Sequence, residues 1–163
     1  MCPARHASFC ACYDCAMFCF SVSVEVGAPP SRVWRALCDP AEVVVWDTGV
    51  ERALDAPADY PQPGQHVRWR YSNGPFRVLH DRPQEVVPER TLRSLISNGP
   101  LRIDETYELE AVAGGGTRLT ATLLLRIPWP IAGAIAERRV FGPATKHAVT
   151  ASLSAIKRHC EAG

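Results

Sequence analysis

The stretch HVRWRYSNGPFRVLHDRPQEVVPERTLRSLISNGPLRIDETYELEAVAGGGTRLTATLLLRI, residues 66–127, decides the fold because turn signals interrupt it at regular intervals. Asn-Gly pairs favour type I′ hairpin turns, in which both central residues need a positive φ. The turn signals divide the stretch into five strand-length pieces. The four turn signals are Asn73-Gly74, Val87–Arg90, Asn98-Gly99 and Ala113–Gly116. We therefore predict an antiparallel meander of five consecutive strands.

Apolar and polar residues alternate along the strands of this meander, which is typical of a sheet with one buried face. In the last strand, leucines and an isoleucine face one way while arginines and threonines face the other. The strand before it has an apolar row with one exception, because Glu105 stands between Ile103 and Tyr107. We expect this row to face the protein interior.

The segment before the meander predicts one strand and two short helices. Residues 18–26 alternate strictly and end at Gly27, which is typical of a half-buried strand. Pro29 and Pro30 then lead into a first helix, because proline suits the first helical turn. Asp39-Pro40 starts a second helix, with Asp39 as its N-cap and Glu42 placed to complete a capping box.

The chain after the meander predicts one long helix. It starts beyond residues 128–130, with a kink expected at Gly142-Pro143, and runs to about Cys160. Its apolar residues recur at the three- and four-residue spacing of one helix face. They are Val149, Leu153, Ile156 and Cys160. This face predicts packing against the sheet.

Two pieces of local sequence, VEVGAPPSRVWRALCDP at residues 24–40 and GGTRLT at residues 115–120, add to this order of elements. With Trp46, they resemble the START and birch-pollen-allergen-like superfamily, most closely its polyketide cyclase/dehydrase branch. The resemblance implies an α+β helix-grip fold over residues 17–163. In this fold a curved, seven-stranded antiparallel sheet wraps around the long C-terminal helix, with two short helices after the first strand. It also implies a cavity for an apolar or aromatic small molecule.

Five of the seven cysteines lie within the first 19 residues, before the regular pattern begins. Cys10, Cys12, Cys15 and Cys19 could hold zinc through their thiolates, but their C-x-C-x2-C-x3-C spacing matches no common zinc motif. The alternative is that Met17 is the true start and that residues 1–16 are an upstream extension or a disordered tail. We favour the second interpretation and expect no metal site.

Composition limits the classes of partner. The chain has 163 residues, 47% apolar residues and a formal net charge of +1, so it gives no general attraction to nucleic acid or anionic membranes. No apolar run approaches the roughly 20 residues that would span a bilayer. We expect a cytoplasmic, soluble single domain without a cofactor, whose partner is a hydrophobic or aromatic small molecule.

Glu105 and Tyr107 are the candidate catalytic residues. A carboxylate desolvated between apolar neighbours has a raised pKa, which suits it to donate or accept a proton. The alternative is a structural carboxylate that is hydrogen-bonded to an arginine or tyrosine of a neighbouring strand. Other inward side chains are candidate ligand contacts. They are Trp69, Tyr71, Ile103, Leu123 and Leu125.

Three functions fit this description. The first is a non-catalytic carrier of an apolar or aromatic ligand, which an all-apolar cavity would favour. The second is a cyclase or dehydratase that acts on a polyketide-like substrate, which a buried ionisable residue in an accessible cavity would favour. The third is an interaction module similar to chaperone co-activators, which a filled core would favour. The sequence contains no motif that decides among them.

Overall fold

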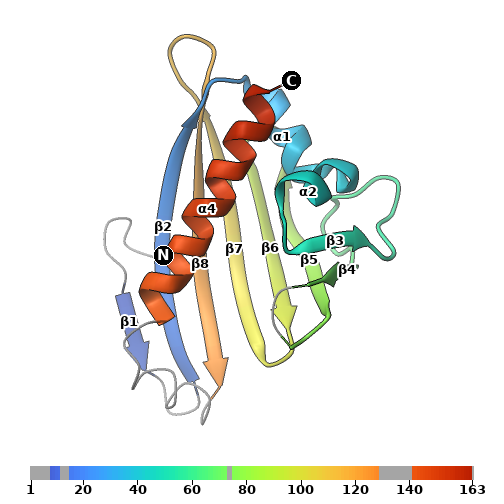
Figure 1. The fold of residues 1–163 in the computed structure, drawn as a ribbon, viewed down its shortest axis with the longest axis vertical. Helices are drawn as coiled ribbons and strands as arrows, with labels where there is room; N and C mark the ends of the chain where they lie inside the picture. Colours follow the sequence, from blue (N-terminus) through green and yellow to red (C-terminus); the bar gives the residue numbers. More distant parts are fainter. Residues whose placement is uncertain (1–7, 12–14, 73–74, 129–140, 163) are drawn as a thin grey trace.

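The computed structural model describes residues 8–11, 15–72, 75–128 and 141–162 (Figure 1). Within these residues a single antiparallel sheet forms one layer, and the helices cover its inner face. The elements are β1 Ser8–Ala11, β2 Cys15–Val26, α1 Pro30–Cys38, α2 Pro40–Trp46, β3 Val50–Ala53, β4 Val67–Tyr71, β5 Val78–Val87, β6 Thr91–Asn98, β7 Leu101–Ala111, β8 Thr117–Pro128 and α4 Phe141–Glu161.

The strand order in the described part of the sheet is β1-β2-β8-β7-β6-β5-β4-β3. Strands β4 to β8 form the expected meander, and β8 returns to pair with β2 from Thr117↔Val26 to Pro128↔Cys15. The sheet curves around α4, which crosses its inner face diagonally (Figure 1). The predicted α+β helix-grip fold is therefore confirmed.

Two strands go beyond the six that the sequence pattern predicts, and the described sheet has eight strands where the resemblance implies seven. β3 follows α2 directly and pairs with β4, although it has only four residues and lies in a polar stretch. β1 pairs with β2 at the opposite edge of the sheet. It belongs to the cysteine-rich segment, so four residues of that segment join the sheet edge. The expectation that residues 1–16 lie outside the folded domain stays a prediction, and the side chains of the suggested zinc ligands Cys10, Cys12 and Cys15 are outside the described part.

The two short helices form as predicted, and a cluster of charges joins them to α4. Asp39 caps α2, because its Oδ1 accepts a hydrogen bond of 2.8 Å from the backbone N–H of Ala41. Glu42 does not complete a capping box. Its carboxylate instead binds Arg32 at 2.6 Å, and Nε2 of His159 on α4 lies 2.9 Å from the same oxygen. The carboxylate of Glu42 thus links α2 to Arg32 on α1 and to His159 on α4.

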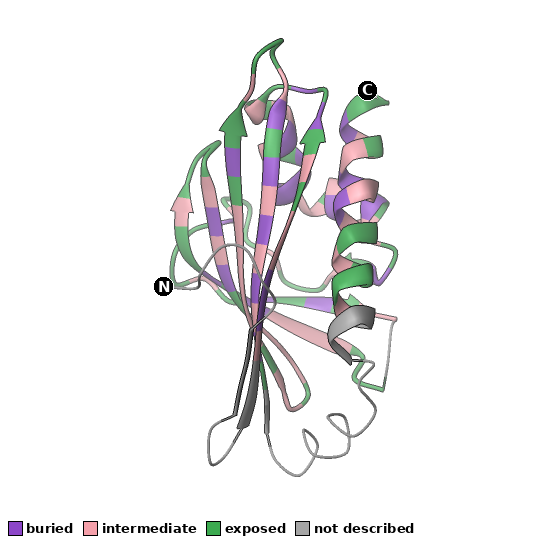
Figure 2. Cartoon of the chain, turned by 90° about the vertical axis from the view of Figure 1, so that its left-hand side faces the viewer, coloured by how far each residue is buried: buried purple, intermediate pink, exposed green. Residues whose placement is uncertain are grey.

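The apolar stripe of α4 packs against the sheet as its spacing predicts. Leu153, Ile156 and Cys160 are buried, and Val149 is half-buried. Buried residues alternate with exposed ones along the strands and face the helix (Figure 2). The helix begins at Phe141, so Gly142-Pro143 lies in its first turn, where proline is tolerated. No helix in the described residues is long and apolar enough to cross a membrane.

Candidate functional site

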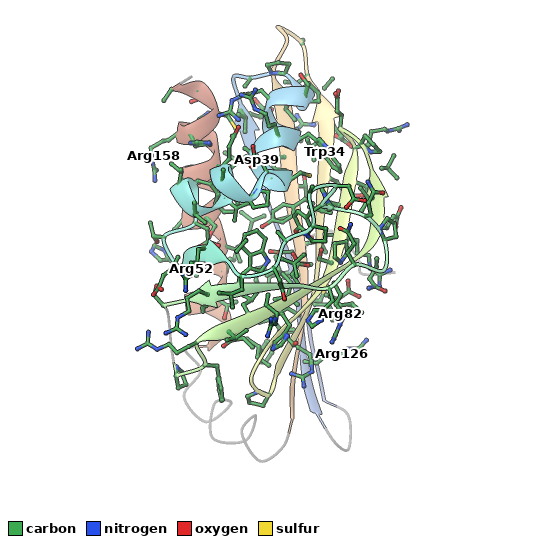
Figure 3. All side chains as sticks on the ribbon, turned by 90° about the vertical axis from the view of Figure 1, so that its right-hand side faces the viewer. Trp34, Asp39, Arg52, Arg82, Arg126 and Arg158 are labelled. Carbon is green, nitrogen blue, oxygen red and sulfur yellow. The ribbon has the colours of Figure 1, made fainter. Side chains whose placement is uncertain are left out.

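A pocket of about 180 Å³ lies between the inner face of the sheet, α2 and α4. Side chains crowd the space around it (Figure 3). A cavity of about 150 Å³ can hold benzene, so the space suits a ligand with one aromatic ring. Aliphatic and indole side chains from every surrounding element form most of the wall. They include Leu37, Val43, Trp46, Trp69, Ile96, Ile103, Val149 and Leu153.

Glu105 and Tyr107 lie side by side on the pocket wall. They are two residues apart on β7, so the period of the strand points both inward. Tyr107 Oη donates a hydrogen bond of 3.1 Å to Oε1 of Glu105. Both are only half-buried by exposed area, and we attribute their remaining exposure to the pocket that they line.

The surroundings of Glu105 favour its neutral form. Desolvation raises the pKa of Glu105 from 4.5 to about 7, and the carboxylates of Asp81 and Asp47 act in the same direction. The hydrogen bond from Tyr107 opposes this rise. The pKa of the Tyr107 phenol is itself raised by desolvation and by Glu105, so its hydroxyl keeps its proton. Glu105 can therefore take up or release a proton near neutral pH.

Asp81 and Tyr60 form a second pair of an acid and a phenol. Tyr60 Oη donates a hydrogen bond of 2.7 Å to Oδ2 of Asp81, and the Tyr60 ring packs edge-on against Trp69. Asp81 is only 7% exposed, and desolvation raises its pKa while the Tyr60 bond acts against the rise. Within the described structure, Oδ1 of Asp81 and the hydroxyl of Ser94 have no partner at hydrogen-bond geometry, although Ser94 and Trp69 lie close enough to Asp81 to lower its pKa as donors.

Asp47 provides a third carboxylate, from the C-terminal end of α2. Its Oδ1 accepts a hydrogen bond of 2.9 Å from the backbone N–H of Gly49. Burial raises the pKa of Asp47, and backbone N–H groups act against the rise. The pocket therefore combines an apolar wall with carboxylates from α2, β5 and β7.

Strand alternation keeps the basic side chains of β5 to β8 away from the pocket face of the sheet. Among the described residues that line the pocket, none is a lysine, arginine or histidine. Four arginines instead line a groove of about 670 Å³ between Arg82 on β5 and Arg126 on β8, both labelled in Figure 3. Asp104, next to Glu105 in sequence, belongs to this groove and pairs with Arg93 at 2.7 Å.

The structure brings most of the predicted site residues together. Trp69, Tyr71 and Ile103 line the same pocket as Glu105 and Tyr107. Leu123 and Leu125 are 4% and 1% exposed and lie in the core of the sheet, and they are not among the residues that line the pocket. Their role as ligand contacts stays a prediction.

Besides Ser152 on α4, four polar pocket residues were missed at the sequence level. Alternation along residues 75–86 is weak and ends on β5 at the register change between Pro83 and Glu85, so the inward direction of Asp81 was not recognised. A signal was present in the inward row Leu79, Asp81, Pro83, which has the same period as the row that contains Glu105. The missed residues are Asp47, Tyr60, Asp81 and Ser94.

The helix-grip fold and its internal pocket place this chain in a class of proteins whose fold encloses a ligand cavity. Comparison with known protein families agrees with this assignment. Residues 17–161 match the model of the family described as polyketide cyclase / dehydrase and lipid transport, and the chain belongs to this family. A search of the curated proteins found no match.

Several solved structures are similar to this chain at low sequence identity. An aromatase/cyclase from a Streptomyces species has a TM-score of 0.67 at 16% identity, covering 89% of this chain and 94% of its own. A protein of unknown function from Staphylococcus aureus has a TM-score of 0.69 at 15% identity, covering 88% and 94%. A protein from Rhizobium loti has a TM-score of 0.62 at 22% identity, covering 86% and 98%. These similarities concern the fold alone.

Proposed function

We propose that the protein binds a small molecule with an apolar or aromatic body in the pocket between the sheet, α2 and α4. The observation that carries the proposal is the pocket itself, whose wall is mainly aliphatic and indole surface. Burying an apolar ligand there removes its surface from water, which stabilises the complex by roughly 25 cal/mol for each Å². Trp46 and Trp69 offer flat surfaces on which a ring can pack.

The volume limits the size of the ligand. About 180 Å³ is less than the roughly 300–1,000 Å³ of pockets that hold drug-sized molecules. A single ring with short substituents therefore fits better than a polycyclic skeleton. An interaction module without a ligand is less well supported, because a filled core was the feature expected of it.

Binding can be tested by filling the pocket. Ser152 on α4 lines the pocket, whereas the neighbouring Ala151 is exposed. Toluene and benzyl alcohol should cause saturable NMR shifts at the indole N–H groups of Trp46 and Trp69. Ser152→Phe should abolish these shifts, because a benzyl group of about the size of the ligand occupies the space, and the matched control Ala151→Phe should retain them. Equal binding by both variants would place the ligand elsewhere and refute the proposal.

Acid/base catalysis on the bound molecule is a second candidate function. It is favoured by one observation, the raised pKa of Glu105, about 7, beside the Tyr107 hydroxyl in an accessible pocket. The ionised Glu105 could remove a proton next to a ligand carbonyl, giving an enolate and a neutral carboxylic acid. The same step starts ring closure or loss of water in a polyketide-like substrate, the chemistry suggested by the name of the Streptomyces aromatase/cyclase.

Proton transfer can be measured without the natural substrate. In D₂O, the protein should speed deuterium exchange at the CH₂ group of phenylacetone, which has one ring and one ketone. The rate should rise with pH and level off above about 7, where Glu105 is ionised. Glu105→Gln should lose this rate and still bind toluene. Exchange at the wild-type rate in the Gln variant would exclude Glu105 as the base and leave the binding function intact.

A further inference from the structure

The polar groups of the pocket mainly accept hydrogen bonds. The hydroxyl hydrogens of Tyr60 and Tyr107 are already donated to the carboxylates of Asp81 and Glu105. The carboxylate and phenol oxygens of the pocket are thus left to accept, and an ionised carboxylate can only accept, while the hydroxyls of Ser94 and Ser152 can both donate and accept. The indole N–H of Trp46 is also occupied, because it donates to the backbone oxygen of Ala36 at 2.7 Å.

Two buried oxygen atoms of the pocket have no partner at hydrogen-bond geometry within the described structure, although the side chains of Ser94 and Trp69 lie close enough to Asp81 to lower its pKa as donors. They are Oδ1 of Asp81 and the hydroxyl oxygen of Ser94, on residues that are 7% and 6% exposed. A buried polar atom without a partner costs roughly 1–3 kcal/mol, so such atoms are rare in folded proteins and call for an explanation. Both residues line the pocket, where a ligand could supply the missing donor.

The charge of the pocket is equally one-sided. Asp47, Asp81 and Glu105 come from α2, β5 and β7, and the other titratable side chains of the lining are tyrosines. α4 contributes Val149, Ser152 and Leu153, which carry no charge. Buried carboxylates need a cation or a proton, and the described lining provides no cationic side chain. His66, just before β4 and outside the lining, is the basic side chain that acts on Asp81, and it lowers the pKa of that carboxyl.

We propose that the ligand of this pocket carries a basic nitrogen on its small apolar or aromatic body, and that its ammonium group binds among Asp81, Glu105 and Ser94. This inference rests on the proposed function that the pocket binds a small molecule. The ammonium group donates up to three hydrogen bonds, which suits the free acceptors, and its positive charge replaces the proton that the isolated carboxylates would hold. The ring then packs against the indoles and aliphatic side chains of the wall.

This arrangement links binding to pH. A cation next to Glu105 and Asp81 favours their ionised forms and lowers pKa values that burial has raised. Affinity for an amine should therefore rise as the pH rises through about 7, and binding near pH 7 should release protons. A neutral ligand of the same shape should show neither effect.

Three one-ring probes of nearly equal size test the inference by isothermal titration calorimetry. Benzylamine is a cation, benzyl alcohol is neutral and benzoate is an anion in the relevant pH range. Near pH 8 we expect benzylamine to bind about tenfold tighter than benzyl alcohol or better, as a hydrogen bond to a charged group allows, and benzoate to bind weakest. Near pH 5 the preference should largely disappear. Titration in two buffers with different ionisation enthalpies should detect proton release with benzylamine only.

Variants assign the effect to the carboxylates. Asp81→Asn and Glu105→Gln keep the shape of the side chain and an oxygen that can accept from the tyrosine. Each should reduce benzylamine affinity to about that of benzyl alcohol measured with the same variant, and a cooperative urea-unfolding transition shows that the variant is folded. Glu108→Gln is the matched control, because Glu108 is exposed and lies on β7 close to Glu105 in sequence but outside the pocket. It should bind all three probes as the wild type does.

The outcomes separate the inference from the function on which it rests. Equal affinity for benzylamine and benzyl alcohol, or tighter binding of benzoate, would overturn the inference while the proposed binding function stands. A preference for benzylamine that survives in both carboxylate variants would also overturn it. If none of the probes binds, both the inference and the proposed function of the pocket are refuted.

Discussion

Replacing Glu105 by Gln should stabilise the protein above neutral pH but not in acid. The folded protein raises the pKa of Glu105 from 4.5 to about 7, so ionising this residue costs more in the folded than in the unfolded chain. At 1.36 kcal/mol for each pKa unit, the shift corresponds to about 3 kcal/mol. We take this as an upper limit, because water in the pocket screens the charge.

The sign follows from the direction of the shift. A group with a raised folded pKa contributes its full stability below the unfolded value, here 4.5, and loses it as the pH rises through about 7. Gln cannot ionise, so Glu105→Gln does not suffer this loss, and its amide oxygen can still accept from Tyr107. Relative to the wild type, the variant should therefore gain up to about 3 kcal/mol in unfolding free energy between pH 4.5 and pH 8.

Urea unfolding at several pH values measures this difference. Glu108→Gln on the exposed face of β7 is the control, and its difference from the wild type should stay within about 0.5 kcal/mol throughout. A carboxyl-resolved NMR titration of the wild type gives the pKa of Glu105 directly. A value below the ordinary one, or a Gln variant that loses stability as the pH rises, would refute the description of Glu105 as a buried acid without a cationic partner.

Three further predictions concern stability. Leu153→Ala should cost about 2–5 kcal/mol in urea unfolding, because Leu153 is buried at the contact of α4 with the pocket, and a cost below 1 kcal/mol would contradict this packing. Although burial acts to raise it, hydrogen bonds from His159 and Arg32 hold the pKa of Glu42 below its ordinary value. Glu42→Gln should therefore destabilise the protein near pH 7 by about 1–3 kcal/mol. The difference in unfolding free energy between variant and wild type should shrink as the pH falls below 4.5, the pKa of Glu42 in the unfolded chain. A difference that stays constant with pH would exclude the ionic explanation. Deleting residues 1–16 should change the melting temperature by only a few degrees, because it removes the edge strand β1 and only the first two residues of β2, and a large loss in calorimetry would show that this edge is required.

Local pattern was enough to predict most of the fold. The hairpin between β6 and β7 forms at the Asn98-Gly99 signal, but Asn98 pairs with Leu101 and of the two residues Gly99 alone has a positive φ, of 56°, so the position of the turn was predicted and its type I′ conformation was not. The cap of α2 at Asp39 and the buried stripe of α4 are also local features, set by side chains within a turn or two of each other. β3 was not predicted because four residues are too few for a periodic signal, and its strand conformation depends on pairing with β4.

The pair of Glu105 and Tyr107 is the part of the site that the sequence by itself determined. Residues two apart on a strand share a face whatever the rest of the chain does, so an acid within an apolar row had to face the interior together with its tyrosine. The order of the elements likewise indicated a helix-grip fold, in which the sheet and the long helix enclose a ligand cavity.

Only the tertiary structure decided the rest of the pocket. Tyr60 comes from the connection between β3 and β4, Asp81 from β5 and Asp47 from the end of α2, and no local rule places them opposite β7. Their positions follow from the curvature of the sheet, which brings α2 and the connection between β3 and β4 over the strands, and a period of two cannot foresee this. The raised pKa values have the same origin, because desolvation depends on every segment that surrounds a carboxylate and not on its neighbours in sequence.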